Sequence, residues 1–324
     1  MFDFSRNAAR YFAAAAATLF LISCGGSDDT PAPPPFASTV AVIGASGADI
    51  GNRCGSADPL CFPVPPYAGT STAANGKLYP QLVAERYGAP LVTSSLGGTN
   101  FAIGGATTGV IPTDTVAQKL PNMQVQLEQY LQRSAFNVNP QTLVIVDGSA
   151  FGNNVKRVIE LVSANPAAAA TLPTAAVVQA ATDIGTLLNR LYAAGARNIL
   201  LTNSSNMGLH PIIAALGPTV VGLATAMSNG YNGALAAQAI PAVKAVSPGL
   251  NIYLLDIGTL SNQVKADPAS FGFTNATAPC YPFFSAPTAP VCATPGTYVW
   301  WDELHPTAAV HSLIAQRGIA TIGR

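Results

Sequence analysis

The stretch Val40-Ala41-Val42-Ile43-Gly44-Ala45-Ser46-Gly47 sets the pattern for the fold. It is a short apolar run rich in β-branched residues that stops at glycine, as expected of a buried strand that leads into a tight turn. Four more runs of this kind follow, at residues 91–93, 143–146, 199–201 and 252–255. The sequence therefore predicts five strands.

Segments with a helical spacing of apolar residues lie between the later runs. Residues 123–131 carry one apolar face, and residues 177–191 carry a second that ends at Ala194-Gly195, where glycine favours the end of a helix. Continuous apolar strands that alternate with helices are typical of a parallel sheet covered on both sides. We predict an α/β domain, a three-layer α/β/α sandwich around a mainly parallel five-stranded sheet. In such a sheet the reacting groups collect at the carboxyl ends of the strands.

The composition excludes some function classes. Charged residues make up 9% of the 324 residues and the formal net charge is zero, so a basic face for nucleic acid is not expected. Hydrophobic residues make up 49%, which is enough for one large core. Neither an internal repeat nor a second domain is indicated.

The N-terminal segment is typical of an export signal. Arg6 and Arg10 precede an apolar run at residues 11–22 that is short for a membrane span. The run ends in Leu21-Ile22-Ser23-Cys24, which resembles the lipobox of bacterial lipoproteins, where the signal is cut before a cysteine that carries the lipid. The alternative is an ordinary signal peptide with an incidental cysteine.

The lipobox resemblance divides the chain into three parts. Residues 1–23 are expected to be the signal peptide, residues 24–36 a proline-rich tether that begins at the lipid-bearing Cys24, and residues 37–324 the folded domain. Gly25 follows Cys24, and by resemblance to Gram-negative lipoproteins the lack of an aspartate there favours the outer membrane. We therefore expect an exported lipoprotein that is anchored in the outer membrane and faces the periplasm or the cell surface.

Four further cysteines form two pairs that are local in sequence, Cys54 with Cys61 and Cys280 with Cys292. An even number of cysteines in an exported chain suggests disulfides. Three pairings are possible, and we favour the local one because each pair brackets a loop rich in proline and small residues. Metal binding is the weaker alternative, since the chain has no CxxC motif and only three histidines.

The C-terminal stretch Trp301-Asp302-Glu303-Leu304-His305-Pro306 carries an acid and a base three residues apart. Across one turn the carboxylate of Asp302 can orient the imidazole of His305 and stabilise its charged form, as in a serine hydrolase. Such a site also needs a nucleophile and donors to the oxyanion. By itself the spacing fits a helix-capping aspartate near an idle histidine better.

The end of the first predicted strand supplies a nucleophile by resemblance to a known family. The segment Val42-Ile43-Gly44-Ala45-Ser46-Gly47-Ala48-Asp49-Ile50-Gly51-Asn52 resembles the first block of the GDSL, or SGNH, hydrolases, typically GDSLSDTGN. Ser46 takes the place of the nucleophilic serine, and Asp49, Gly51 and Asn52 match later positions of the block. Without the family, a strand followed by GxSG is equally compatible with a plain strand-to-helix turn.

Two further segments resemble the next blocks of the family. Residues 97–108, GGTNFAIGGATT, look like the second block, NFAxGGA, which implies that the backbone N–H of Gly105 donates to the oxyanion, with Gly104 as the alternative. Residues 143–154 look like the third block, GGND or GAND after a strand, which implies Asn153 as an amide donor, with Asn154 as the alternative. The plain alternatives are a glycine-rich turn and a pair of loop asparagines.

The resemblance extends over nearly the whole domain. Residues 194–211 look like the fourth-strand region of GDSL enzymes related to autotransporter esterases, and residues 298–311 look like the family's last block. It implies the flavodoxin-like fold of the SGNH hydrolases. His210 and His311 match no catalytic position of the family, and we interpret both as structural.

Two positions depart from the family pattern. Ala45 replaces the acidic residue beside the nucleophile, and Asn154 stands where the family has an aspartate after its asparagine. We interpret the two losses together, because carboxylates of one hydrogen-bonded network that are lost as a pair leave no single buried charge unpaired.

Taken together, the blocks imply a carboxylic ester hydrolase that acts on a small-molecule or lipid ester through a serine acyl-enzyme. Ser46, Asp302 and His305 are the expected catalytic residues. The N–H groups of Ser46 and Gly105 and the amide of Asn153 are the expected oxyanion donors, and no metal or organic cofactor is expected. Aromatic residues of the late loop are candidates for an acyl pocket: Tyr281, Phe283, Phe284, Trp300 and Trp301.

Two alternative functions remain. One alternative is a phospholipase or acyltransferase that uses the same site on membrane lipid. The other is a catalytically silent surface lipoprotein that binds ligands in the cleft.

Overall fold

Four apolar runs of the sequence form one parallel sheet. They are β1 (Thr39–Ile43), β2 (Thr142–Asp147), β3 (Asn198–Thr202) and β4 (Asn251–Leu255), hydrogen-bonded in that order. Nearly all side chains of the first three strands are buried, as expected of strands that are covered on both faces. Because the strands are parallel, their carboxyl ends lie along the same edge of the sheet.

The computed structural model describes residues 36–53, 76–115 and 120–323, which all fall within one unit from Pro35 to Arg324. The expected signal peptide, the lipid-bearing Cys24 and the pair Cys54 and Cys61 lie outside the described residues. Those expectations therefore stay predictions. Among the helices that are described, none has the length and the apolar character needed to cross a membrane.

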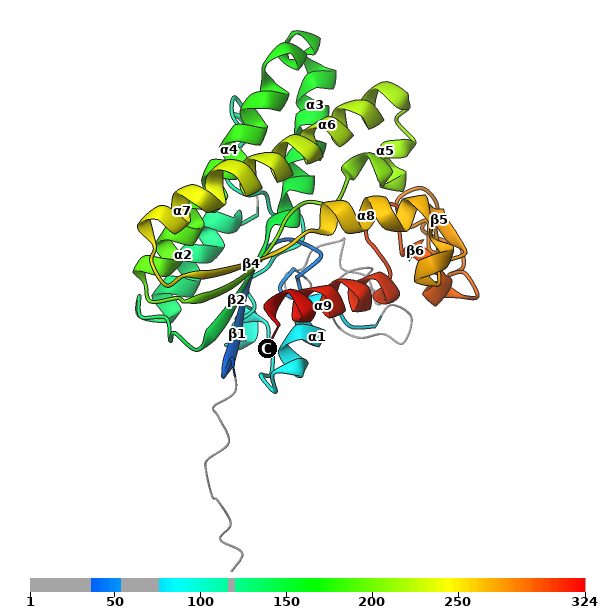
Figure 1. Cartoon of the computed structure of the whole chain (residues 1–324). Coiled ribbons are helices and arrows are strands. Elements are labelled where there is room, and N and C mark those ends of the chain that lie inside the picture. The colour runs from blue at the N-terminus through cyan, green and yellow to red at the C-terminus, as the bar shows by residue number, and fades with distance from the viewer. Residues whose placement is uncertain (1–35, 54–75, 116–119, 324) are drawn as a thin grey trace, which may run out of the picture. The chain divides into compact units, whose positions relative to one another are not determined.

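Alternate side chains of each strand enter two separate cores on opposite faces of the sheet. In β2, Val144 and Val146 enter one core, whereas Leu143 and Ile145 enter the other. Figure 1 shows α2, α3, α4, α6 and α7 on the side of the first core and α1 and α9 on the side of the second. The helices have these bounds: α1 (Tyr79–Arg86), α2 (Met123–Arg133), α3 (Phe151–Ala164), α4 (Leu172–Ala193), α5 (Pro211–Ala214), α6 (Pro218–Ala234), α7 (Ile240–Val246), α8 (Ile257–Ala266) and α9 (Ala308–Ile322). This is the predicted three-layer α/β/α sandwich.

The two helices predicted from apolar spacing are confirmed as α2 and α4. The second ends where the sequence indicated, because Gly195 adopts a φ of 108° and the chain turns there toward β3.

The prediction of a fifth strand at residues 91–93 is wrong. This segment pairs only briefly with Asn100, and Asn100 in turn lies beside the end of β1 at Val42. The chain turns back directly after the segment, and a β-carbon at Gly98 would lie 2.2 Å from the carbonyl oxygen of Val92. This close return leaves no length for a ladder, so the main sheet has four strands among the described residues.

A small second sheet, which the sequence did not predict, stands beside the C-terminal site residues. Its two parallel strands are β5 (Asn275–Pro279) and β6 (Tyr298–Trp300). The loop between them is closed by a disulfide from Cys280 to Cys292, whose α-carbons are 4.9 Å apart. The local pairing predicted for these two cysteines is confirmed.

Candidate active site

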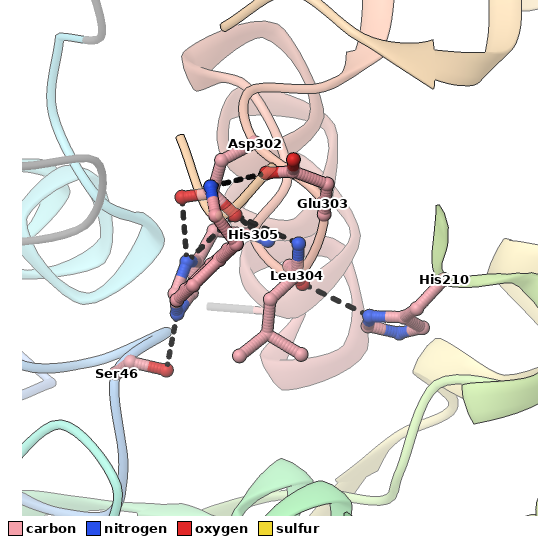
Figure 2. Close-up of polar contacts among 7 residues, drawn as sticks. Ser46, His210, Asp302, Glu303, Leu304 and His305 are labelled. Carbon is pink, nitrogen blue, oxygen red and sulfur yellow. Dashed lines mark hydrogen bonds and ion pairs between the residues drawn. The ribbon is translucent and has the colours of Figure 1, made fainter. Parts of the chain in front are cut away.

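Ser46, Asp302 and His305 meet, although the first is more than 250 residues from the others. His305 Nε2 lies 3.0 Å from Ser46 Oγ, and His305 Nδ1 lies 2.8 Å from Asp302 Oδ2 and 3.0 Å from Oδ1 (Figure 2). A carboxylate oxygen only accepts, so in the neutral imidazole Nδ1 carries the hydrogen and Nε2 accepts from the serine hydroxyl. This arrangement can take a proton from Ser46 and stabilise the imidazolium that results.

The turn that follows β6 fixes the acid and the base. Asp302 Oδ1 accepts hydrogen bonds of 2.7 Å from the backbone N–H groups of both Leu304 and His305. The N–H of Trp301 donates to the carbonyl oxygen of His305 at 2.8 Å, which closes the turn. Asp302 is fully buried, so its carboxylate stays where these bonds hold it. We call this segment the Asp302–His305 turn.

A buried glutamine shapes the turn that carries the nucleophile. Gln126 on α2 contacts both backbone groups of Gly44: its Oε1 accepts from the N–H at 2.9 Å, and its Nε2 donates to the carbonyl at 3.0 Å. A β-carbon at position 44 would lie 2.4 Å from the β-carbon of Asp147, so only glycine fits there. Sequence reasoning missed Gln126, whose signal was a polar residue beside the apolar face of residues 123–131.

Asp147, the last residue of β2, places a buried carboxylate beneath the same turn. Its Oδ1 accepts from Ser149 Oγ at 2.6 Å and from Thr202 Oγ1 at 3.1 Å, and its Oδ2 lies 3.4 Å from the backbone nitrogen of Ala45. Burial raises the pKa of Asp147, and the hydrogen bonds from Ser149 and Thr202 offset part of that rise. Position 45 lacks an acidic side chain, yet a carboxylate from the neighbouring strand stands beside it. The sequence signal was an aspartate that closes an otherwise apolar strand.

Asp49 joins the first block to the second. Its carboxylate accepts from the backbone N–H groups of Gly51 at 2.8 Å, Asn52 at 2.7 Å and Gly104 at 2.8 Å. Burial raises the pKa of Asp49, and these hydrogen bonds act in the opposite direction. The N–H of Gly104 therefore points to Asp49. Gly105 is exposed, has a φ of 89° and is not among the residues that line the pocket beside Ser46, so its role as an oxyanion donor stays a prediction.

The two asparagines of the third block have different surroundings. Asn153, near the start of α3, lines the pocket beside Ser46 and donates to the carbonyl oxygen of Ala106 at 2.8 Å. An amide nitrogen carries two hydrogens, so this bond is compatible with a second one to a ligand. Asn154 is buried and bonds Thr108 through both its amide oxygen and its amide nitrogen. The structure thus brings Asn153, and not Asn154, to the pocket.

His210 contacts the Asp302–His305 turn from the other side (Figure 2). Its Nδ1 lies 2.9 Å from the carbonyl oxygen of Leu304, and its Nε2 lies 2.8 Å from Ser205 Oγ. A carbonyl oxygen only accepts, so Nδ1 carries the hydrogen and Nε2 accepts from Ser205. Burial lowers the pKa of His210 to about 4, which keeps the ring neutral at pH 7. Two residues on, the N–H of Ile212 donates to the carbonyl oxygen of Glu303 at 2.8 Å, so two successive carbonyls of the turn are held.

Glu303 connects the Asp302–His305 turn to the loop that the disulfide closes. Its carboxylate accepts from the N–H of Phe284 at 3.0 Å and from the N–H and hydroxyl of Ser285 at 2.9 Å and 2.6 Å. Burial raises the pKa of Glu303, but these hydrogen bonds outweigh it and the pKa falls below its usual value. The disulfide loop therefore supports the turn through a charged contact.

A pocket that is partly open to solvent extends from Ser46. Trp300 lines it, as predicted, but the other four aromatic residues proposed for an acyl pocket do not, because they contact one another or lie in the core: Tyr281, Phe283, Phe284 and Trp301. Within the described segments, no three His, Cys, Asp or Glu side chains gather into a group suited to a metal ion.

Comparison with known proteins places the chain in a family. The model of the GDSL-like lipase/acylhydrolase family matches residues 40–317. The chain is 26% identical to the GDSL esterase/lipase LTL1 of Arabidopsis thaliana, in an alignment that covers 80% of this chain and 78% of the plant protein. It is 24% identical to lipase 1 of Photorhabdus luminescens (76% of this chain, 45% of the relative) and 25% identical to the thermolabile hemolysin of Vibrio parahaemolyticus (86% and 62%). The alignments therefore span less than two thirds of either bacterial relative. The family match covers most of the chain, which belongs to the GDSL-like lipase/acylhydrolase family, a family of enzymes that hydrolyse esters.

Proposed function

We propose that the chain is a carboxylic ester hydrolase that works through a covalent acyl-serine intermediate. The observation that carries this proposal is the chain of hydrogen bonds from Asp302 through His305 to Ser46. Membership of an ester-hydrolysing family supports it, and so does a largely apolar pocket that begins at Ser46.

In the proposed mechanism His305 serves first as a base and then as an acid. Its Nε2 takes the proton of Ser46 as Oγ attacks the ester carbonyl, and the N–H groups of Ser46 and Gly105 with the Asn153 amide stabilise the oxyanion. His305 then donates the proton to the leaving alcohol. A water molecule, deprotonated by the same imidazole, attacks the acyl-serine, which releases the acid and restores Ser46. Asp302 holds the ring in the required tautomer throughout.

The test measures hydrolysis of p-nitrophenyl butyrate together with labelling by a fluorophosphonate. Ser46→Ala is expected to lower kcat by a factor on the order of 10⁶ and to abolish the adduct, because the acyl-enzyme cannot form. Ser163→Ala, which removes a hydroxyl that bonds only within α3, is the matched control and should behave like the unchanged protein. A folded protein that neither turns over esters nor forms an adduct at Ser46 would favour the silent ligand-binding alternative.

Lipid esters are the second candidate substrates. The bacterial relatives are named a lipase and a hemolysin, and the expected lipid anchor at Cys24 would keep the site close to membrane lipid. Release of fatty acid from phospholipid vesicles, compared with hydrolysis of soluble esters, separates a phospholipase from an esterase. Transfer of the acyl group to an added alcohol identifies an acyltransferase.

We further propose that the chain is exported and anchored in the outer membrane through Cys24. The support is the lipobox-like Leu21-Ile22-Ser23-Cys24 with Gly25 behind it. Incorporation of labelled palmitate into the full chain, lost in Cys24→Ser, tests the anchor, and membrane fractionation tests the location. An unlabelled protein cut elsewhere would indicate an ordinary signal peptide.

A further inference from the structure

The pocket beside Ser46 continues into an apolar space between α8 and α9. Ile257, Leu260 and Val264 line it from α8, and Val310 and Ile314 line it from α9. We call this space the α8–α9 channel and define it by these five residues.

The walls of the channel are aliphatic faces of two helices. On α8 the lining residues are three and four positions apart, and on α9 they are four positions apart, so each set lies on one side of its helix. Ile257, Leu260, Val264 and Ile314 are between 4% and 7% exposed. These four side chains pack in the second core, and they also border the pocket that begins at Ser46.

Two polar side chains that line the same pocket, those of Tyr79 and His311, are neutral. The backbone N–H of Tyr79 donates to His311 Nδ1 at 3.3 Å. Burial lowers the pKa of His311 to about 3 and raises that of Tyr79 well above its usual value, so neither side chain is charged at pH 7. Lys265 lines the pocket from the C-terminal end of α8, where its side chain is exposed. A charged ligand group in the interior would lose its hydration without gaining a partner of opposite charge, whereas hydrocarbon would lose nothing.

We propose that the α8–α9 channel binds the alkyl chain of the substrate's acyl group and that the preferred acyl length is about eight to twelve carbons. This inference rests on the proposed function, in which Ser46 carries the acyl group. The wall from Ile257 to Val264 rises about 10 Å along the helix, which is the length of roughly eight extended carbons at about 1.25 Å each. The carbons between Ser46 and Ile257 come in addition.

The channel suits the acyl side of the ester better than the alcohol side. After acylation the alcohol must leave and water must enter, while the acyl chain stays bound to Ser46. A buried apolar channel hinders the exchange of alcohol for water but retains a hydrocarbon chain. We therefore assign the channel to the acyl chain, which stays attached to Ser46, and not to the alcohol.

The test compares acyl and alcohol chain lengths separately. With p-nitrophenyl esters, kcat/KM should rise about fourfold for each methylene buried, up to the predicted length, and then level off. With acetate esters of increasing alcohol length, kcat/KM should change little. Leu260→Trp fills the channel and should lower the ratio of kcat/KM for the decanoate to that for the acetate by thirtyfold or more. Gln263→Trp puts the same side chain on the exposed face of α8 and should leave this ratio unchanged.

The opposite results would overturn the inference. A dependence on alcohol length, or an equal loss on acetate and decanoate in Leu260→Trp, would mean that the channel does not hold the acyl chain. Calorimetry of decanoate binding to Ser46→Ala protein tests the channel without turnover, so it stays decisive if the proposed function fails. Binding that is weakened by Leu260→Trp supports the inference, and binding that Leu260→Trp leaves unchanged contradicts it.

Discussion

His210 offers the sharpest test of how the Asp302–His305 turn is held. Its Nδ1 donates to the carbonyl oxygen of Leu304, the residue before His305, and its Nε2 contacts Ser205. Asparagine carries an N–H at the position of Nδ1, whereas glutamine carries one at the position of Nε2. Both variants keep a neutral amide, so His210→Asn and His210→Gln differ chiefly in whether the Leu304 carbonyl keeps its donor.

The size of the effect follows from burial. His210 is 7% exposed, and a buried carbonyl that loses its donor costs about 1–3 kcal/mol. The turn can relieve that cost by moving toward water, but a displacement of about 1 Å at the reacting groups lowers the rate on the order of 100-fold. We therefore expect kcat to fall about 10- to 100-fold in His210→Gln and less than about fivefold in His210→Asn, with KM little changed in either.

The assay is kcat and KM on p-nitrophenyl butyrate, with the urea midpoint of each variant as a check on folding. Both variants lose part of the ring, so both should be destabilised to a similar degree by the space left behind. If His210 had only a structural role, the loss of kcat would match the loss of stability in both variants. Equal kcat values in His210→Asn and His210→Gln would therefore refute the argument that the Nδ1 bond positions the turn.

Three other predictions follow from the described contacts. Ala45→Asp should lower stability by about 3 kcal/mol and also lower activity. The reason is the repulsion between the new carboxylate and that of Asp147, taken at a separation of about 5 Å and an effective dielectric constant near 20. Adding Asp147→Asn should restore much of the stability measured by urea unfolding, and a gain in both stability and activity from Ala45→Asp alone would contradict this. The pKa of His311 is about 3 in the folded protein and 6.5 in the reference state, so the unfolded chain binds a proton first. His311 should therefore lower stability by roughly 2.5 kcal/mol from pH 7 to pH 4.5 and leave it level above pH 7. His210, whose folded pKa is about 4, should cause a similar fall, so His311→Leu should remove about half of the combined slope in urea titrations, and an unchanged slope would assign the pH dependence to other groups. Replacing Cys280 and Cys292 together by serine should cost about 3 kcal/mol, because the bond closes a loop with a sequence separation of 12. A reductant should destabilise the unmutated protein by about this amount more than it destabilises the variant, which keeps only the expected Cys54–Cys61 bond; an equal effect on both proteins would contradict the prediction.

The sequence predicted those parts of the fold that depend on continuous local patterns. β2 and β3 are apolar throughout and lie at the centre of the sheet, so their composition alone indicates strands that are covered on both faces. Residues 91–93 show the same composition, but a strand also needs a neighbour of matching length, and the close return of the chain at Gly98 removes it. β5 is polar, partly exposed and ends in proline, so its pairing with β6 left no pattern to find.

In the site, too, contacts between residues close in the sequence could be predicted, whereas contacts between distant residues could not. The spacing of Asp302 and His305 allowed a contact within one turn, and the resemblance to the family's last block made that contact the prediction. The partners that hold the turns come from elsewhere in the chain: Gln126 is 82 residues from Gly44, and His210 is 94 residues from Leu304. The sequence does not name the partners of these side chains: Gln126 is marked only as a polar residue beside an apolar face, and a lone polar residue on a helix or in a loop has many possible partners.

The departure at Ala45 shows that a motif can lose an acidic residue while the folded protein keeps a carboxylate beside that position. Read along the chain, the change removes an acidic side chain beside the nucleophile. In the folded protein the carboxylate of Asp147 reaches the backbone of Ala45 from the next strand, and the hydroxyls of Ser149 and Thr202 satisfy its Oδ1. Burial makes a second carboxylate at this place costly. An acid at the end of β2 therefore goes together with the absence of an acid at position 45. A parallel sheet brings the ends of neighbouring strands together, so a carboxylate beside the turn of the nucleophile can come from more than one residue number.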